Sequence, residues 1–179
     1  YADAVFECFD GKFTAANLTG ATFYTQSEVG KMSKRYHNVV NPDDVIEKYG
    51  ADCFRMYEMF LGPIEQSKPW DMMGIEGINK FLRKLWSLFY NEQDEWVVTT
   101  AEPKETSYKV LHATIKKTEE DIERFSFNTA ISQFMICVNE LRKTEERSTS
   151  ILSPLVQLIA PFAPFVAEEL WQQLGHKES

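Results

Sequence analysis

The stretch FNTAISQFMICVNEL, residues 127–141, carries its apolar side chains at the spacing of an α-helix. They form one broad face, which consists of Ala130, Ile131, Phe134, Met135, Cys137, Val138 and Leu141. Ser126 or Asn128 would cap the start of this helix. Such a helix is stable when its apolar face packs against other elements, so the stretch predicts a helical bundle.

Helical patterns continue from this stretch toward both ends of the chain. Residues 150–174 are the most apolar part, in which Pro161 and Pro164 divide two helices and Gly175 ends the second. Toward the N-terminus, one apolar stripe predicts a helix through Leu111, Ile115, Ile122 and Phe125. An earlier stripe predicts another through Ile78, Phe81, Leu82, Leu85, Leu88 and Phe89. The polar residues 91–105 would connect these two helices.

Two short helices are predicted before the bundle. Asn41 would cap the first, which begins at Pro42 and ends at Gly50. Asp52 would cap the second, which runs to residue 60. Residues 62–77 contain three glycines and two prolines, so we expect a connecting loop there, with Trp70 as its anchor.

Residues 1–30 differ from the rest of the chain. Runs of β-branched and aromatic residues at 5–9 and 22–25 predict one or two short strands, with a turn at Asp10-Gly11. The segment begins without an initiator methionine, so we expect it to be cut from a longer chain. The predicted fold is mainly α, with a short N-terminal β segment and an antiparallel helix bundle.

The composition excludes several classes of protein. Of the 179 residues, 44% are hydrophobic, but no apolar run reaches the length of a transmembrane helix. Three scattered cysteines (Cys8, Cys53 and Cys137) argue against a disulfide framework or a zinc site and favour the reducing cytosol. The net charge of −8 argues against broad nucleic-acid binding. In the rest of the chain, acidic side chains outnumber basic ones. Residues 31–90 instead carry nine basic and eight acidic side chains, so a polyanion would dock there.

A cluster of cations follows Gly30, in the sequence Lys31-Met32-Ser33-Lys34-Arg35. Ammonium groups and a hydroxyl on a short loop are the groups that bind phosphate, although the spacing is not that of a Walker A loop. Taken alone, the cluster is explained better by a solvated basic turn.

The other chemically active residue types suggest no catalytic site. The three histidines, His37, His112 and His176, have no second ligand at metal spacing, and Cys53 and Cys137 fall on apolar faces. The paired carboxylates fit helix capping and solvation. The chain has neither a G-x-G-x-x-G nor a His-x-Gly-His motif, so the basic loop has no companion nucleotide pocket in it.

Five ordered motifs between Gly30 and Gly175 resemble the class I aminoacyl-tRNA synthetases. KMSKR at 31–35 is similar to their KMSKS signature, and the segment that follows, up to Arg55, resembles theirs as well. MFLGP with the later KPW resembles the leucyl subfamily in particular. FNTAI, and PFAP followed by AEELW, resemble the helical-domain signatures of that subgroup. Arg35 replaces the usual serine, and Phe165 stands where relatives often have histidine.

The resemblance implies a fragment of a leucine–tRNA ligase, which activates leucine with ATP and transfers it to tRNA(Leu). Residues 1–40 would end the catalytic domain and carry the KMSKS-like loop. Residues 41–70 would be a helical stem-contact unit, and residues 71–179 a helical bundle of the anticodon-binding type. Lys31 and Lys34 would be catalytic and, with Ser33, would bind the ATP phosphates. Mg²⁺ would accompany ATP, and no metal site is expected.

The resemblance also suggests where tRNA docks. Lys80, Arg83 and Lys84 on one helix would contact its phosphates, although a solvated face explains them equally well. The full enzyme would be a cytoplasmic monomer without a membrane partner. Because the nucleotide-binding fold with its HIGH signature is missing, we expect the isolated fragment to be inactive. Three alternatives stay open: an isoleucyl, valyl or methionyl synthetase fragment, a non-catalytic tRNA-binding helical module, and a helical interaction scaffold.

Overall fold

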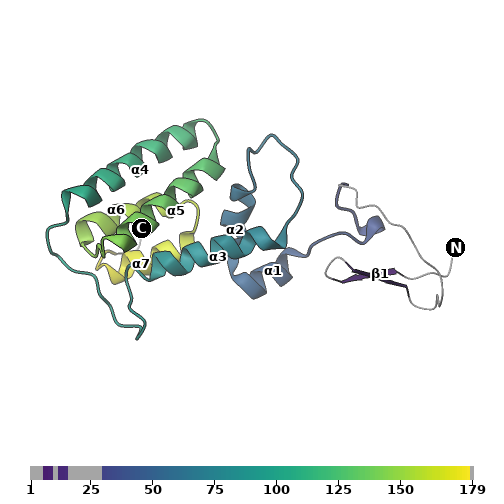
Figure 1. Cartoon of the computed structure of the whole chain (residues 1–179), viewed down its shortest axis with the longest axis horizontal. Helices are drawn as coiled ribbons and strands as arrows, with labels where there is room; N and C mark the ends of the chain where they lie inside the picture. Colours follow the sequence, from purple (N-terminus) through teal and green to yellow (C-terminus); the bar gives the residue numbers. More distant parts are fainter. Residues whose placement is uncertain (1–5, 10–11, 16–29, 178–179) are drawn as a thin grey trace. The chain divides into compact units, whose positions relative to one another are not determined.

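The computed structural model describes residues 6–9, 12–15 and 30–177 (Figure 1). The chain divides into two compact units, residues 1–37 and residues 38–179. Within the described residues the structure is mainly helical, which confirms the predicted fold class. None of the described helices is long and apolar enough to cross a membrane.

In the first unit, two short strands form an antiparallel hairpin. Strand β1 (Phe6–Phe9) pairs with β2 (Lys12–Ala15), with Phe6 opposite Ala15 and Phe9 opposite Lys12. Strand β1 confirms the strand predicted at 5–9. The turn predicted at Asp10-Gly11 and the strand predicted at 22–25 lie outside the described residues. The short 3-10 helix η1 (Lys34–Tyr36) ends this unit.

The second unit begins with two short helices, α1 (Pro42–Tyr49) and α2 (Ala51–Phe60). The Asn41 side chain accepts a hydrogen bond from the Asp43 backbone N–H at 3.3 Å, so the predicted N-cap is confirmed. Gly50 joins the two helices at a φ of 87°, a conformation that favours glycine.

The expected role of Asp52 as the cap of α2 is wrong. Asp52 lies in the first turn of α2, and its side chain is buried. Its two carboxylate oxygens accept hydrogen bonds from the backbone N–H groups of Phe165 and Val166, at 3.3 and 2.7 Å. These donors belong to the first turn of α7 (Pro164–Gln173). A carboxylate satisfies such donors well, because the first N–H groups of a helix have no partner within it. Asp52 therefore caps a different helix and ties α2 to α7.

Helix α3 (Met72–Trp86) begins six residues earlier than predicted, inside the stretch 62–77 that was expected to be a loop. Asp71 caps it, since its side chain accepts a hydrogen bond from the Met73 N–H at 2.9 Å. The two helical glycines that suggested a loop do not break the helix. At Gly74 the lack of a side chain lets α3 approach α2 closely, because an added Cβ would lie 2.8 Å from the Tyr57 ring. Trp70 packs against Phe54 and Tyr57, as its expected role of anchor requires.

Helix α4 (Glu105–Glu123) forms, but the apolar stripe predicted for it is wrong at its C-terminal end. Ile122 and Phe125 are 41% and 63% exposed. The face that packs inward consists of Ser107, Leu111, Thr114, Thr118 and Asp121. The two threonines can be buried because their hydroxyls each donate to the backbone carbonyl four residues earlier, at 2.8 Å.

The remaining helices confirm their predictions. Helix α5 (Phe127–Lys143) starts after Ser126, although without a side-chain cap, and packs along α4. Helix α6 (Thr149–Ile159) and α7 are separated at Pro161, and Gly175 follows α7 at a φ of 89°. The connection between α3 and α4 is held to the start of α6 by a short bridge: the Thr99 N–H donates to the Arg147 carbonyl at 2.9 Å, and the Thr99 carbonyl accepts from the Thr149 N–H at 2.8 Å.

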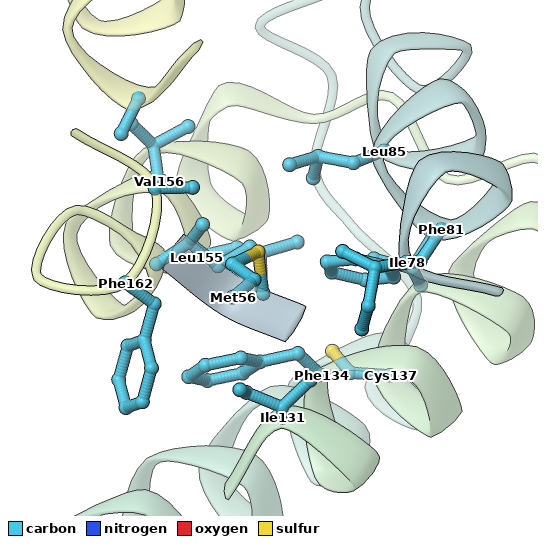
Figure 2. Packing of buried hydrophobic residues seen from close by; sticks show 14 of the residues in the cluster. Met56, Ile78, Phe81, Leu85, Ile131, Phe134, Cys137, Leu155, Val156 and Phe162 are labelled. Atoms are coloured by element: carbon cyan, nitrogen blue, oxygen red, sulfur yellow. The ribbon is translucent and has the colours of Figure 1, made fainter. Parts of the chain in front are cut away.

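One hydrophobic core joins the helices of residues 38–179. Figure 2 shows Met56 of α2 among side chains from α3, α5 and α6, including Ile78, Phe134 and Leu155. Most of the predicted stripe of α5 is fully buried, as are Leu85 and Leu88. Since α2 contributes Met56 and Tyr57 to this core, the two short helices and the bundle form one packed body.

Candidate phosphate loop and nucleic-acid surface

The predicted phosphate loop is a short, exposed turn in the first unit. The Ser33 hydroxyl accepts a hydrogen bond from the Arg35 backbone N–H at 3.2 Å and so caps η1. The Ser33 carbonyl accepts from the Tyr36 N–H at 3.0 Å. His37 ends the turn at a φ of 51°. The sequence therefore places a serine where its side chain shapes the turn.

The turn presents groups suited to an anion. The side chains of Lys31 and Lys34 are exposed, and Ser33 lies half-buried between them. The Ser33 hydroxyl caps η1, and a hydroxyl is one of the groups that bind phosphate in proteins. The Arg35 guanidinium lies 6.0 Å from the centre of the Tyr36 ring. Lys31, Ser33 and Lys34 thus lie within four residues of the chain, at an exposed turn.

The three cations predicted to contact tRNA lie on α3 and are all exposed. Lys84 is held in place, because its ammonium group donates to the Asn139 side-chain oxygen on α5 at 3.0 Å. Arg83 lines a groove beside this contact, which does not include Lys80. The three residues therefore share a helix but have different surroundings.

The α3–α5 groove has a volume of about 900 Å³. It is lined by residues from the C-terminal half of α3, the turn that follows it, α5 and the loop after α5: Arg83, Trp86, Ser87, Tyr90, Asn91, Glu92, Ile136, Asn139, Glu140, Arg142, Lys143, Glu145 and Arg147. Sequence reasoning missed Arg142 and Arg147, because only the packing of α5 against α3 places them beside Arg83. The basic residues near the C-terminal end of α5 were the available signal.

A smaller hollow of about 370 Å³ lies where α2 ends. Arg55, Met59, Ile64 and Phe127 contribute to its walls. The Arg55 guanidinium donates to the Pro161 carbonyl at 3.5 Å, so this arginine joins α2 to the α6–α7 turn. The Arg55 side chain thus has a structural role, which is to hold α2 against this turn.

The buried thiols do not form a catalytic site. Burial, with a further contribution from the charge of Asp52, raises the pKa of Cys53 to about 11. Burial also raises the pKa of Cys137. Both thiols therefore stay protonated near neutral pH and act as core residues, as the sequence indicated. The part of the chain that the structure describes holds no group of three or more His, Cys, Asp or Glu side chains that could bind a metal ion.

Two protein families match parts of the chain. The family described as tRNA synthetases class I (I, L, M and V) matches residues 13–71, which include the predicted phosphate loop. The family described as the anticodon-binding domain of tRNA ligase matches residues 104–179, which include α4 to α7. The two matches are consecutive and do not overlap.

Similar proteins with curated names are leucine--tRNA ligases. The one from Parabacteroides distasonis is 55% identical over 176 residues, which are 98% of this chain and 18% of the relative. The one from Cytophaga hutchinsonii is 56% identical over 162 residues, 90% of this chain and again 18% of the relative. The chain thus spans about 18% of the length of the curated relatives that it matches.

A solved structure has a similar fold. It is the crystal structure of the ternary complex of Agrobacterium radiobacter K84 agnB2 LeuRS with tRNA and LeuAMS. Its TM-score with this chain is 0.70 at 31% sequence identity, over 83% of this chain and 21% of the other.

Proposed function

Because this chain belongs to the class I tRNA synthetases and matches leucine--tRNA ligases over nearly its whole length, we propose that it works as part of such an enzyme. The enzyme would activate leucine with ATP and pass the leucyl group to tRNA(Leu). The observation that supports this chain's own part is the exposed turn that gathers Lys31, Ser33 and Lys34.

In the first step, a leucine carboxylate oxygen attacks the α-phosphorus of ATP. The bond from the α-phosphorus to the bridging oxygen breaks, and the products are leucyl-adenylate and pyrophosphate. Negative charge grows on the leaving pyrophosphate in the transition state. Lys31 and Lys34 would stabilise that charge on the β- and γ-phosphates, and the Ser33 hydroxyl would donate a hydrogen bond. Mg²⁺ would arrive with ATP as part of the substrate.

Arg35 keeps a cation at the position where the family's signature has serine. Its backbone N–H donates a hydrogen bond to the Ser33 hydroxyl, and its guanidinium lies 6.0 Å from the centre of the Tyr36 ring. Arg35 therefore helps to close the turn through its backbone, and the side chains of Lys31 and Lys34 are exposed.

In the second step, the helices of residues 38–179 would support the tRNA. Residues 41–70 would form the stem-contact unit and residues 71–179 the anticodon-binding-type bundle, with Lys80, Arg83 and Lys84 as phosphate contacts. The residues after position 90 carry nine basic and fifteen acidic side chains, which favours a limited contact surface over broad wrapping of RNA. The described thiols, Cys53 and Cys137, are free, which suits the cytoplasm as the working compartment.

The test is leucine-dependent ATP–pyrophosphate exchange by the full-length protein, in which Lys34 is replaced by alanine. Removal of one preorganised cation from the leaving group should lower the exchange rate roughly 10²- to 10³-fold. The matched control is Lys116→Ala, which removes an exposed lysine from α4 and should leave the rate unchanged. An unaltered exchange rate in Lys34→Ala would overturn the assignment of this loop to the ATP phosphates. Absence of exchange in the wild-type full-length protein would overturn the proposed ligase activity. A protein that binds tRNA without exchange would instead be a non-catalytic module.

A further inference from the structure

The phosphate loop ends at a residue with an unusual backbone. His37 has a φ of 51° and a ψ of 30°, in the left-handed region that residues other than glycine seldom adopt. Histidine, like asparagine, enters this region more often than most residues do, whereas a β-branched residue is a genuine outlier there. The identity of residue 37 therefore determines how easily the turn can end in this conformation.

The same conformation occurs at Phe125 and Glu145, but with more support from the fold. These two residues follow the ends of α4 and α5, which are 19 and 17 residues long and pack against each other. In contrast, η1 has three residues, and none of them is buried. Costly backbone conformations persist where the surrounding structure enforces them. At η1 little packing does so, and the preference of residue 37 itself has more weight.

His37 closes the turn that carries Lys34. Lys34 is the first residue of η1, and its carbonyl accepts a hydrogen bond from the His37 backbone N–H at 3.3 Å. At the other end of the turn, the Ser33 side chain accepts from the Arg35 N–H at 3.2 Å. A side chain thus fixes the start of the turn, and the backbone of His37 fixes its end.

Contacts of the imidazole do not explain this position. The His37 side chain is exposed and makes no hydrogen bond, ion pair or ring contact with any residue that the structure describes. The boundary between the two compact units falls directly after His37. Its φ and ψ therefore set the direction in which the chain leaves the phosphate loop.

We propose that His37 is a positioning residue for the adenylation step and that it acts through its left-handed backbone. By ending η1 in this conformation, His37 keeps Lys34 in the orientation in which its ammonium group meets the leaving phosphates of ATP. A cation that is already oriented stabilises the growing charge without a further cost of ordering, so its loss lowers the rate of the step. This inference rests on the proposed function of the loop.

The experiment measures leucine-dependent ATP–pyrophosphate exchange by the full-length protein, with four replacements at position 37. His37→Val should lower kcat roughly fivefold to thirtyfold, because valine disfavours the left-handed region, and should leave KM for leucine unchanged. His37→Asn and His37→Gly enter that region readily and should keep kcat within about threefold of the wild-type value. His37→Ala should lie between the two groups.

The matched control is His112→Val. It makes the same replacement at an exposed histidine of α4, where the backbone is helical, and should leave the exchange rate unchanged. Thermal melting of each variant identifies any loss of fold. If His37→Val melts at a lower temperature than the wild type, the comparison of His37→Ala with His37→Asn decides the question, since alanine should be the slower of the two.

Two results would overturn the proposal. One is a kcat that does not differ between the valine or alanine variant and the asparagine variant. The other is a loss in His37→Asn and His37→Gly as large as that in His37→Val, which would make the imidazole the functional group. The proposed function fails separately, through absence of exchange in the wild-type protein or an unaltered rate in Lys34→Ala, and neither result depends on position 37.

Discussion

Two glycines of α3, three residues apart, occupy opposite environments. Gly74 faces α2, where a Cβ would lie 2.8 Å from the Tyr57 ring, whereas a Cβ on Gly77 would meet nothing within 4 Å. Tyr57 itself is fixed, because it is fully buried and its hydroxyl accepts a hydrogen bond from the Asp71 N–H at 3.1 Å. A single methyl group therefore tests how closely the two helices pack.

Gly74→Ala should destabilise the fold by about 1–3 kcal/mol, because the methyl group overpacks the contact with Tyr57. Gly77→Ala should stabilise it by about 0.5–1 kcal/mol, because alanine favours the helix and has room. Urea unfolding followed by circular dichroism measures both. If the two variants changed the free energy of unfolding in the same direction, the close approach of α2 and α3 would be wrong.

At the scale of elements, side chains rather than loops fix several helices to one another. Asp52 of α2 caps α7, Lys84 of α3 reaches Asn139 of α5, and Glu146 precedes α6. The Glu146 carboxylate accepts hydrogen bonds from the backbone N–H groups of Arg147 and Ser148 at 3.1 and 2.9 Å. The Asp52 and Lys84 contacts join residues far apart in the chain, whereas the Glu146 carboxylate binds the N–H groups of the two residues that follow it.

Asp52→Ala should lower the free energy of unfolding by about 1–3 kcal/mol, because it leaves the Phe165 and Val166 N–H groups without their acceptor. The comparison is Glu47→Gln on the exposed surface of α1, for which we expect a change within about 0.5 kcal/mol. Denaturant unfolding at pH 7 distinguishes them. Equal effects of the two substitutions would show that the α2–α7 contact contributes nothing to stability.

Glu146 should make stability depend on pH in the acid range. Burial alone would raise its pKa, but the donors around its carboxylate, which include the backbone N–H groups of Ser148 and Arg147, outweigh burial and lower the pKa from its ordinary value of 4.5. A carboxyl whose pKa is lower in the folded state stabilises the fold above its unfolded pKa and loses this effect as pH falls through the folded value.

The stability difference between wild type and Glu146→Gln should therefore be largest above pH 5 and shrink as the pH falls through and below 4.5. Urea midpoints measured from pH 7 to pH 3 test this expectation. Glu145→Gln, at the exposed neighbouring position, is the control. A difference that stayed constant over this range would contradict a lowered pKa at Glu146.

At the scale of the whole molecule, the phosphate loop and the helical body belong to different compact units. The loop carries the cations proposed for ATP, and the helices carry those proposed for tRNA. The chain holds neither a G-x-G-x-x-G nor a His-x-Gly-His motif, so nothing in its sequence indicates a pocket for adenine or leucine.

We therefore expect the 179-residue chain alone to show no leucine-dependent ATP–pyrophosphate exchange, because phosphate contacts without a nucleotide pocket cannot align the reactants. Purified chain, compared with a buffer blank and with the full-length protein, tests this. Exchange above the blank would mean that these residues contain a complete adenylation site.

The sequence predicted the helices whose buried face is apolar and misread those whose buried face is not. The stripe of α5 was found because its alanine, phenylalanine and leucine side chains both show the helical period and fill the core. In α4 the inward face carries Thr114 and Thr118, whose hydroxyls are satisfied within the helix, so counting apolar residues selected a more exposed face.

The candidate site was predictable only where its residues are adjacent in the chain. Lys31, Ser33 and Lys34 form a local motif that resembles a known signature, so the sequence alone predicts this loop as a candidate site. Arg83 and Arg142 are 59 positions apart in the sequence, and only the packing of α3 against α5 places them in the wall of one groove. Their groove therefore required the structure.

The division into two units also determines what intrinsic fluorescence can detect. All four tryptophans, Trp70, Trp86, Trp96 and Trp171, lie in residues 38–179, and two of them contact Tyr90. Tryptophan fluorescence therefore reports on the helical unit and does not detect changes confined to residues 1–37. A change at the phosphate loop on ATP binding will need its own reporter, such as a tryptophan placed at Tyr36, beside the lysines it would monitor.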